Sequence, residues 1–143
     1  MMTGMESANL RTTIPSRYFT LNEANQVLGG LRNEFESAIL YNRKLHKILS
    51  GLSKDSEAEE LKTKARRVRA EIEQLLTIVT SKGVEVGNLS PGTLDFPALR
   101  NGKQVYVSWR TGDDRISWWR PMLKPKNHRK LVHPEGVCWE WRN

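Results

Sequence analysis

The chain has 143 residues, of which 38% are hydrophobic and 27% are charged, and its formal net charge is +7. This length fits one domain, or one domain with an extension, and the composition is that of an ordinary globular protein. No apolar run reaches the roughly 18 residues of a transmembrane helix, and residues 1–17 lack the apolar segment of a secretory signal, so we expect no membrane insertion. The single cysteine, Cys138, permits no internal disulfide, and we expect a cytoplasmic location.

Residues 1–17 are rich in serine and threonine, and we predict a disordered leader there. A helix is predicted to begin after Thr20, because Thr20 and Glu23 have the spacing of a capping box. Apolar residues then recur at steps of three and four, as in an amphipathic helix: Ala24, Leu28, Leu31, Phe35, Ala38, Leu45 and Leu49. Gly29 and Gly30 weaken this helix, which should end near Ser50 and Gly51.

A second helix should follow a second capping box, formed by Ser56 and Glu59. Its seam is apolar at every position: Ala58, Leu61, Ala65, Val68, Ile72, Leu75 and Val79. Gly83 is its expected left-handed cap. The short connection predicts an antiparallel hairpin over residues 18–83. Two helices cannot cover each other's apolar surface, so the hairpin base should pack on the rest of the chain and its tip on a second copy, as a homodimer.

After Gly83 the pattern alternates with period two, which predicts a small β module over residues 84–120. Turns are expected at residues 88–92, at Asn101-Gly102 and at residues 112–114, with strands between them and a further strand over residues 115–120. Pro97 should restrict its segment to an edge or a strand end. The predicted fold is α+β: a long antiparallel two-helix hairpin followed by a small antiparallel β-meander of three to four strands.

The last part of the chain, residues 121–143, is predicted to be a basic, tryptophan-containing C-terminal extension, in which residues 137–141 could add a strand. All five tryptophans lie between Trp109 and Trp141. Residues 84–143 contain ten Lys and Arg against six Asp and Glu, a net charge of +4. Such a segment either attracts a polyanion or an acidic protein, or serves as a solvated tail that keeps the protein soluble.

Several blocks of the sequence resemble the uncharacterised prokaryotic family known as domain of unknown function 2203. The resemblance covers about residues 18–119 and rests on residues 18–24, 83–86, 92–97, 105–112 and 116–119, in matching order. It implies a two-helix segment followed by a small β unit, and it implies no activity. The family pattern has cysteine where this chain has Ser108 and histidine where it has Arg120, which weakens a metal or nucleophilic site with Asp95.

Asp95 lies between two apolar residues, so its side chain should point away from theirs in a strand. A buried Asp95 paired with Arg110 or Arg100 would be either functional or a structural lock, and we favour the lock. Trp118 and Trp119 are adjacent, so in a strand they face opposite sides, and one of them is exposed or covered by the tail or a partner.

Exposed tryptophan beside arginine could anchor a protein contact or stack on a nucleobase. The candidate binding residues are Arg110, Arg115, Trp118, Trp119, Arg120, Lys124, Lys126, Arg129 and Lys130. The spacing of His128, His133 and Cys138 matches no standard zinc site, so we expect no metal and no cofactor. Catalytic motifs are absent from the sequence, so enzyme activity ranks lowest.

The favoured hypothesis is therefore a non-enzymatic interaction module that is dimeric through its hairpin and presents a tryptophan and arginine surface to a protein partner. The alternative is a nucleic-acid-binding protein that uses the same tryptophans for stacking and the basic C-terminal segment for phosphates.

Overall fold

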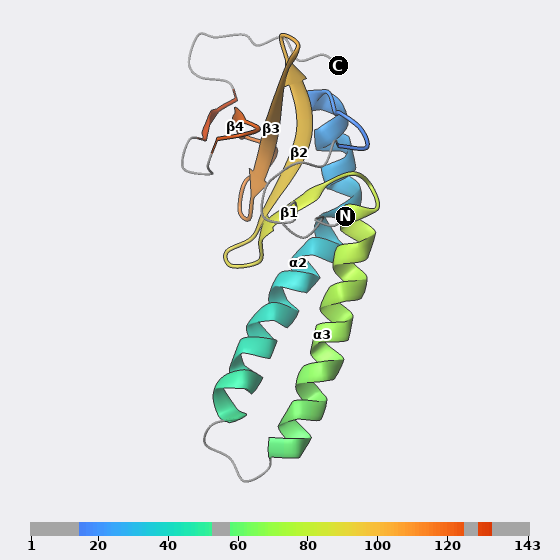
Figure 1. Cartoon of the computed structure of the whole chain (residues 1–143), viewed down its shortest axis with the longest axis vertical. Helices are drawn as coiled ribbons and strands as arrows, with labels where there is room; N and C mark the ends of the chain where they lie inside the picture. The colour runs from blue at the N-terminus through green and yellow to red at the C-terminus, as the bar shows by residue number, and fades with distance from the viewer. Residues whose placement is uncertain (1–14, 53–57, 125–128, 133–143) are drawn as a thin grey trace, which may run out of the picture.

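A computed structural model describes residues 15–52, 58–124 and 129–132. It confirms the predicted α+β class, with two helices followed by an antiparallel sheet. The helices form a long hairpin, and the sheet lies against one end of it (Figure 1). No helix in those ranges is both long and apolar enough to cross a bilayer. The leader 1–17 and the extension 121–143 stay predictions.

The first helix, α2, spans Leu21–Leu52. Its capping box forms as predicted: the Glu23 amide donates to Thr20 Oγ1 at 3.0 Å, and the Thr20 amide donates to Glu23 Oε1 at 2.9 Å. Two of the N-terminal amides that a helix leaves unpaired thus have partners, which fixes where α2 begins. The helix ends at Leu52, just past the predicted stop.

The second helix, α3, spans Ala58–Thr80 and packs antiparallel against α2. Gly83 has a φ of +88°, and its amide donates to the Thr80 carbonyl at 3.0 Å. The left-handed cap predicted at Gly83 is therefore confirmed. Ser56, one half of the second predicted capping box, lies outside the described residues.

The sheet is a meander in which each strand pairs with the next along the chain. Its strands are β1 (Glu85–Asn88), β2 (Thr93–Arg100), β3 (Lys103–Arg110), β4 (Trp118–Pro121) and β5 (Lys130–Leu131). The count is five, where the sequence predicted three to four, because β5 comes from the segment assigned to the extension. The strand considered at residues 137–141 lies outside the described part of the chain.

The strand predicted from residue 115 begins only at Trp118. The Ile116 amide donates to Asn25 Oδ1 on α2 at 2.8 Å, and the Ile116 side chain is buried in the core. The chain at Ile116 is therefore held against α2, and its pairing with β3 begins only at Trp118.

Pro97 lies inside β2, which runs between two other strands. Pairing with β1 ends at Asp95, so the edge of β2 at Pro97 faces the chain near Phe19 instead. The Phe19 amide donates to the Pro97 carbonyl at 2.7 Å. The missing proline N–H faces this same side and removes no bond to β3, which explains why proline is tolerated there.

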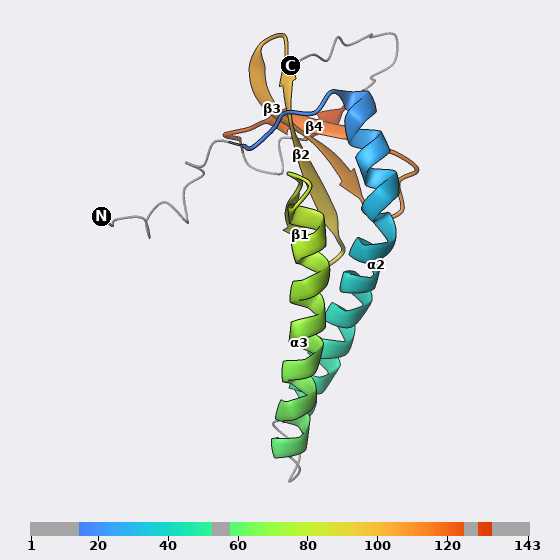
Figure 2. The ribbon, with the colours of Figure 1, turned by 90° about the vertical axis from the view of Figure 1, so that its right-hand side faces the viewer.

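One face of the sheet packs on the N-terminal half of α2 (Figures 1 and 2). As predicted, Val105, Val107 and Trp109 share that face, and all three are buried. Phe35 on α2 meets Trp109 edge to face with centroids 6.1 Å apart, and Phe19 meets Phe96 in the same way at 5.4 Å. These contacts form the main core.

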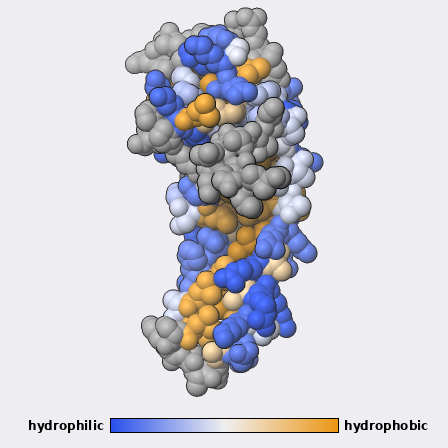
Figure 3. Space-filling model, viewed as in Figure 1, coloured by the Kyte–Doolittle hydropathy of each residue, from blue (hydrophilic) through white to orange (hydrophobic). Residues whose placement is uncertain are grey.

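A second, smaller core lies between the helices, away from most of the sheet. Its buried members are Leu45, Ala65, Val68 and Ile72. Tyr41, Ile48 and Leu49 pack against this cluster but are only partly buried. Figure 3 shows apolar surface continuing along the hairpin below the sheet.

Gly92 follows the turn between β1 and β2, where the sheet approaches α2. It has a φ of +127°, and a Cβ there would overlap Ile39 Cδ1 and Thr111 Oγ1. We predict that Gly92→Ala lowers the free energy of unfolding by about 2 kcal/mol or more, through backbone strain and steric overlap. Urea denaturation followed by circular dichroism measures this change.

The matched control is Gly29→Ala, because Gly29 is exposed on α2 and an added Cβ there would meet open space. This variant should gain up to about 1 kcal/mol from helix propensity. A Gly92→Ala protein as stable as the wild type would contradict the close approach of sheet and helix.

Candidate functional site

The face of the sheet opposite the helices carries buried polar side chains. The register of the strands sets Asp95 of β2 between Glu85 of β1 and Ser108 of β3. Asp95, Ser108 and Arg120 are 3%, 0% and 6% exposed. Such burial is unusual for charged side chains, which need partners when they leave water.

Asp95 is the centre of this cluster. Ser108 Oγ donates to Asp95 Oδ1 at 2.7 Å, and Arg120 of β4 donates to Asp95 Oδ2 at 3.3 Å. An Arg129 guanidinium nitrogen lies 3.8 Å from Oδ1, which is an ion pair without a hydrogen bond. One carboxylate thus connects β2 with β3, with β4 and with the residue that precedes β5.

Arg120 extends the cluster in two directions. Its other terminal nitrogen donates to the Lys124 carbonyl at 2.7 Å and to the Met122 carbonyl at 3.4 Å, which fixes the chain after β4. Its guanidinium also lies 4.6 Å from the centroid of the Tyr106 ring. The Tyr106 hydroxyl in turn donates to the carboxylate of Glu85, at 2.9 and 3.1 Å to its two oxygens.

Arg129 is the less completely satisfied of the two arginines. Burial lowers the pKa of Arg129, the Asp95 carboxylate opposes that shift, and the nearby positive charges of Arg120 and Arg110 add to it. Within the described chain, Arg129 Nε, Thr93 Oγ1 and Trp118 Nε1 are buried and have no hydrogen-bond partner. The polar face therefore has spare donors around a central carboxylate.

Both Asp95 oxygens already accept from, or pair with, hydroxyl and guanidinium groups. Ser108 is 0% exposed, so its hydroxyl, which donates a hydrogen bond to Asp95, is not accessible to a substrate. The expected pairing of Asp95 with Arg110 or Arg100 is not seen: Arg120 and Arg129 take those places.

The two adjacent tryptophans face opposite sides of β4, as predicted. Trp119 is buried in the main core at 6% exposure, with Arg100 at 4.6 Å and Lys130 at 5.7 Å from its ring centroid. Trp118 is half-buried, and Arg110 lies 4.1 Å from its ring centroid. Neither indole is freely presented to solvent.

Three of the remaining candidate binding residues are exposed on the surface. Arg115 and Lys124 are exposed, Lys130 is exposed above Trp119, and Lys126 lies outside the described residues. Among described residues, no three metal-ligating side chains come together. His128, His133 and Cys138 lie outside that part of the chain.

Comparison with known families finds one match. A family described as uncharacterized conserved protein (DUF2203) matches residues 17–132. The chain belongs to the DUF2203 family. No curated protein and no solved structure matches it.

The DUF2203 match extends beyond residue 119, the end of the resemblance in the sequence analysis, and it includes Arg120, Arg129 and β5. Ser108 and Arg120, the two positions at which the sequence analysis expects a departure from the family pattern, both contact Asp95. Asp95, Ser108 and Arg120, the three positions that the resemblance links, are therefore in contact. In this DUF2203 protein they form a carboxylate held by a hydroxyl and a guanidinium.

We predict that Asp95→Asn destabilises the protein by about 3 kcal/mol or more, because two buried or half-buried guanidinium groups lose their counter-charge. Urea unfolding gives the free-energy change. The matched control is Asp114→Asn, which removes the same charge from an exposed turn and should change stability by about 0.5 kcal/mol or less. Equal effects of the two substitutions would contradict the lock.

Proposed function

We propose that the protein is a non-enzymatic interaction module that pairs with a second copy through its hairpin tip and presents the basic end of its sheet to a protein partner. The hairpin tip is defined as residues 40–52 of α2 and 58–72 of α3. As part of this proposal we place the module in the cytoplasm, which suits a chain whose single cysteine has no second thiol to bond with.

The observation that carries the self-pairing is the apolar surface of the tip. Leu40 is 60% exposed, while its neighbours Tyr41 and Ile48 are only partly buried. Leu40, Lys44 and Ile48 are spaced by four residues and share one side of α2. Because each helix has only the other to cover it here, the tip keeps apolar area in water that a partner could bury.

The shape of this surface favours a second copy as the occupant. A shallow groove of about 300 Å³ is lined by Ser37, Leu40, Tyr41 and Lys44. In a two-fold dimer the same patch faces itself, so Leu40 of one copy could enter the groove beside Leu40 of the other. Two hairpins joined in this way make a four-helix bundle, the common solution for amphipathic helix pairs.

The polar cluster supports a binding module rather than an enzyme. Asp95, the most buried carboxylate of the sheet's polar face, has its oxygens engaged by Ser108, Arg120 and Arg129. A general base needs a lone pair directed at a substrate proton. The cluster is better suited to holding the strands in register.

Binding of nucleic acid is the second candidate. It draws support from the net charge of +7 and from the exposed Arg115, Lys124 and Lys130. It needs aromatic rings on which bases can stack. Trp119 is buried and Trp118 already carries Arg110 above its ring, so the observations favour a protein partner.

The self-pairing predicts that the wild-type protein sediments as a dimer in analytical ultracentrifugation. Leu40→Glu should weaken dimerisation about a hundredfold or more, because it removes apolar contact and places two like charges in the interface.

The control is Leu123→Glu, the same change at a leucine that is 83% exposed on the other end of the molecule. This variant should remain dimeric. A wild-type protein that sediments as a monomer at all concentrations, or equal weakening by both substitutions, would contradict self-pairing through the tip.

A further inference from the structure

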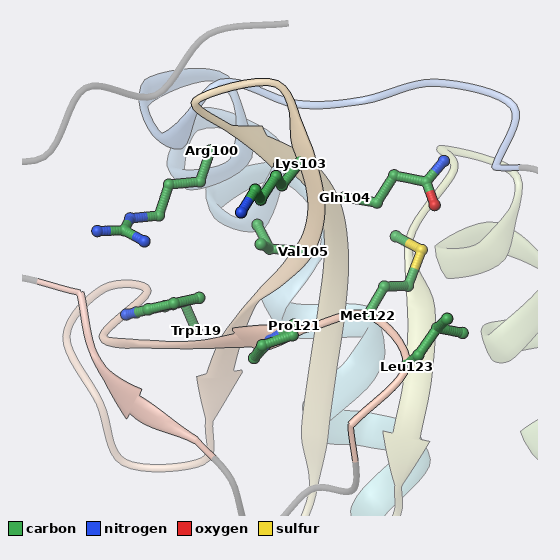
Figure 4. A pocket seen from close by; sticks show the side chains of 8 residues that line it. All are labelled: Arg100, Lys103, Gln104, Val105, Trp119, Pro121, Met122 and Leu123. Atoms are coloured by element: carbon green, nitrogen blue, oxygen red, sulfur yellow. The ribbon is translucent and has the colours of Figure 1, made fainter.

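A groove of about 510 Å³ lies at the end of the sheet farthest from the hairpin tip, beside the turn between β2 and β3 (Figure 4). It is lined by Arg100, Lys103, Gln104, Val105, Trp119, Pro121, Met122 and Leu123. Its volume is within the range of known ligand sites. In Figure 4 the lining residues lie on both sides of β3, so the groove passes around the strand where β4 ends.

The charge of the groove is one-sided. Arg100 and Lys103 line it, Lys130 lies over the Trp119 ring, and Lys124 follows Leu123 in the chain. No aspartate or glutamate is among the described lining residues. Arg100 is half-buried, and this burial lowers the pKa of its guanidinium. Cations gathered in this way create a potential that attracts negative groups.

The groove also has an apolar side. Val105, Pro121 and Met122 are buried or half-buried, and they are followed by Leu123, which is 83% exposed. Leu123 adds apolar surface to this side of the groove, and an apolar side chain of a partner would remove that surface from water. Cationic and apolar walls together would bind a chain that carries both acidic and apolar side chains.

We propose that this groove binds an acidic, extended segment of a protein partner, with its carboxylates on Arg100 and Lys103 and an apolar side chain against Pro121 and Leu123. The proposal rests on the proposed function in one respect, namely that the partner is a protein. It does not depend on dimerisation, because the groove and the hairpin tip are at opposite ends of the molecule (Figure 1).

The observations favour a protein segment over RNA. The Trp119 ring has Arg100 and Lys130 above it and is 6% exposed, so a base could not stack on it without displacing them. Leu123 and Pro121 offer apolar contacts, which suit aliphatic or aromatic side chains better than phosphates and ribose. Carboxylates, in contrast, match the guanidinium of Arg100.

The test uses the full chain, immobilised, and a degenerate library of short peptides built from Asp, Glu, Lys, Gln, Leu and Phe. Wild-type protein should enrich peptides in which acidic residues flank Leu or Phe. Lys103→Glu should reduce their retention about tenfold or more, through loss of attraction and added repulsion. Arg115→Glu makes the same charge change at an exposed position outside the groove and should retain most of the binding.

Three results would overturn the proposal. The first is a library without enrichment of acidic residues, and the second is equal loss of binding in the Lys103→Glu and Arg115→Glu proteins. The third is tighter binding of single-stranded polyuridylate RNA than of the enriched peptides, with a steep salt dependence that Lys103→Glu reduces.

Leu40→Glu separates the two proposals. If this variant is monomeric and still enriches acidic peptides, both proposals hold. If wild-type protein is monomeric and enriches them, only the self-pairing fails. Dimeric wild-type protein without enrichment defeats the groove proposal alone.

Discussion

Two helices alone cannot bury all of their apolar side chains. The rest of this structure depends on how that remaining apolar surface is covered. The sheet covers the N-terminal half of α2, where Phe35 and Leu31 join Trp109 and Val107 in the main core. Beyond the sheet, the described residues that form a buried cluster between the helices are Leu45, Ala65, Val68 and Ile72. The two ends of the hairpin are therefore unequal: one is covered by the sheet, and the other keeps apolar surface in water, where we propose that a second copy binds.

The sheet packs against the base of the hairpin, and its two faces have different roles in the fold. Its apolar face supplies most of the burial that stabilises the fold. Its polar face joins strands that have few backbone bonds of their own, since β5 pairs over only two residues. The ion pairs of Asp95 with Arg120 and Arg129 hold these short strands in place. Buried ion pairs add little net stability but strongly disfavour arrangements in which one partner is lost.

Local features of the sequence determine much of this fold. The capping box at Thr20 and Glu23 and the cap at Gly83 are encoded within a few residues, and both were predictable. The Asn101-Gly102 turn also fixes the register of β2 and β3. If the strands are paired outward from that turn, Asp95 lies opposite Ser108. This contact could be predicted from the turn, whereas the alternation of apolar residues alone does not predict it.

Other contacts depend on how the chain runs from one element to the next, which no local sequence motif determines. Arg120 reaches Asp95 from β4 and Arg129 from the position directly before β5, and no hairpin motif in the sequence sets the register of either strand. Arg110 and Arg100, which are nearer in sequence, pack on Trp118 and Trp119 instead. The late start of β4 has the same origin, because Ile116 bonds to Asn25 on a helix about ninety residues away.

Hydrogen–deuterium exchange at several protein concentrations tests most directly whether the open end of the hairpin is covered. A second copy that binds there should slow exchange of the amides in residues 40–52 and 58–72 as concentration rises, while amides of β2 and β3 stay unchanged. Fast exchange in the tip that stays the same up to the highest concentration would show that its apolar surface remains in water, and would contradict the account.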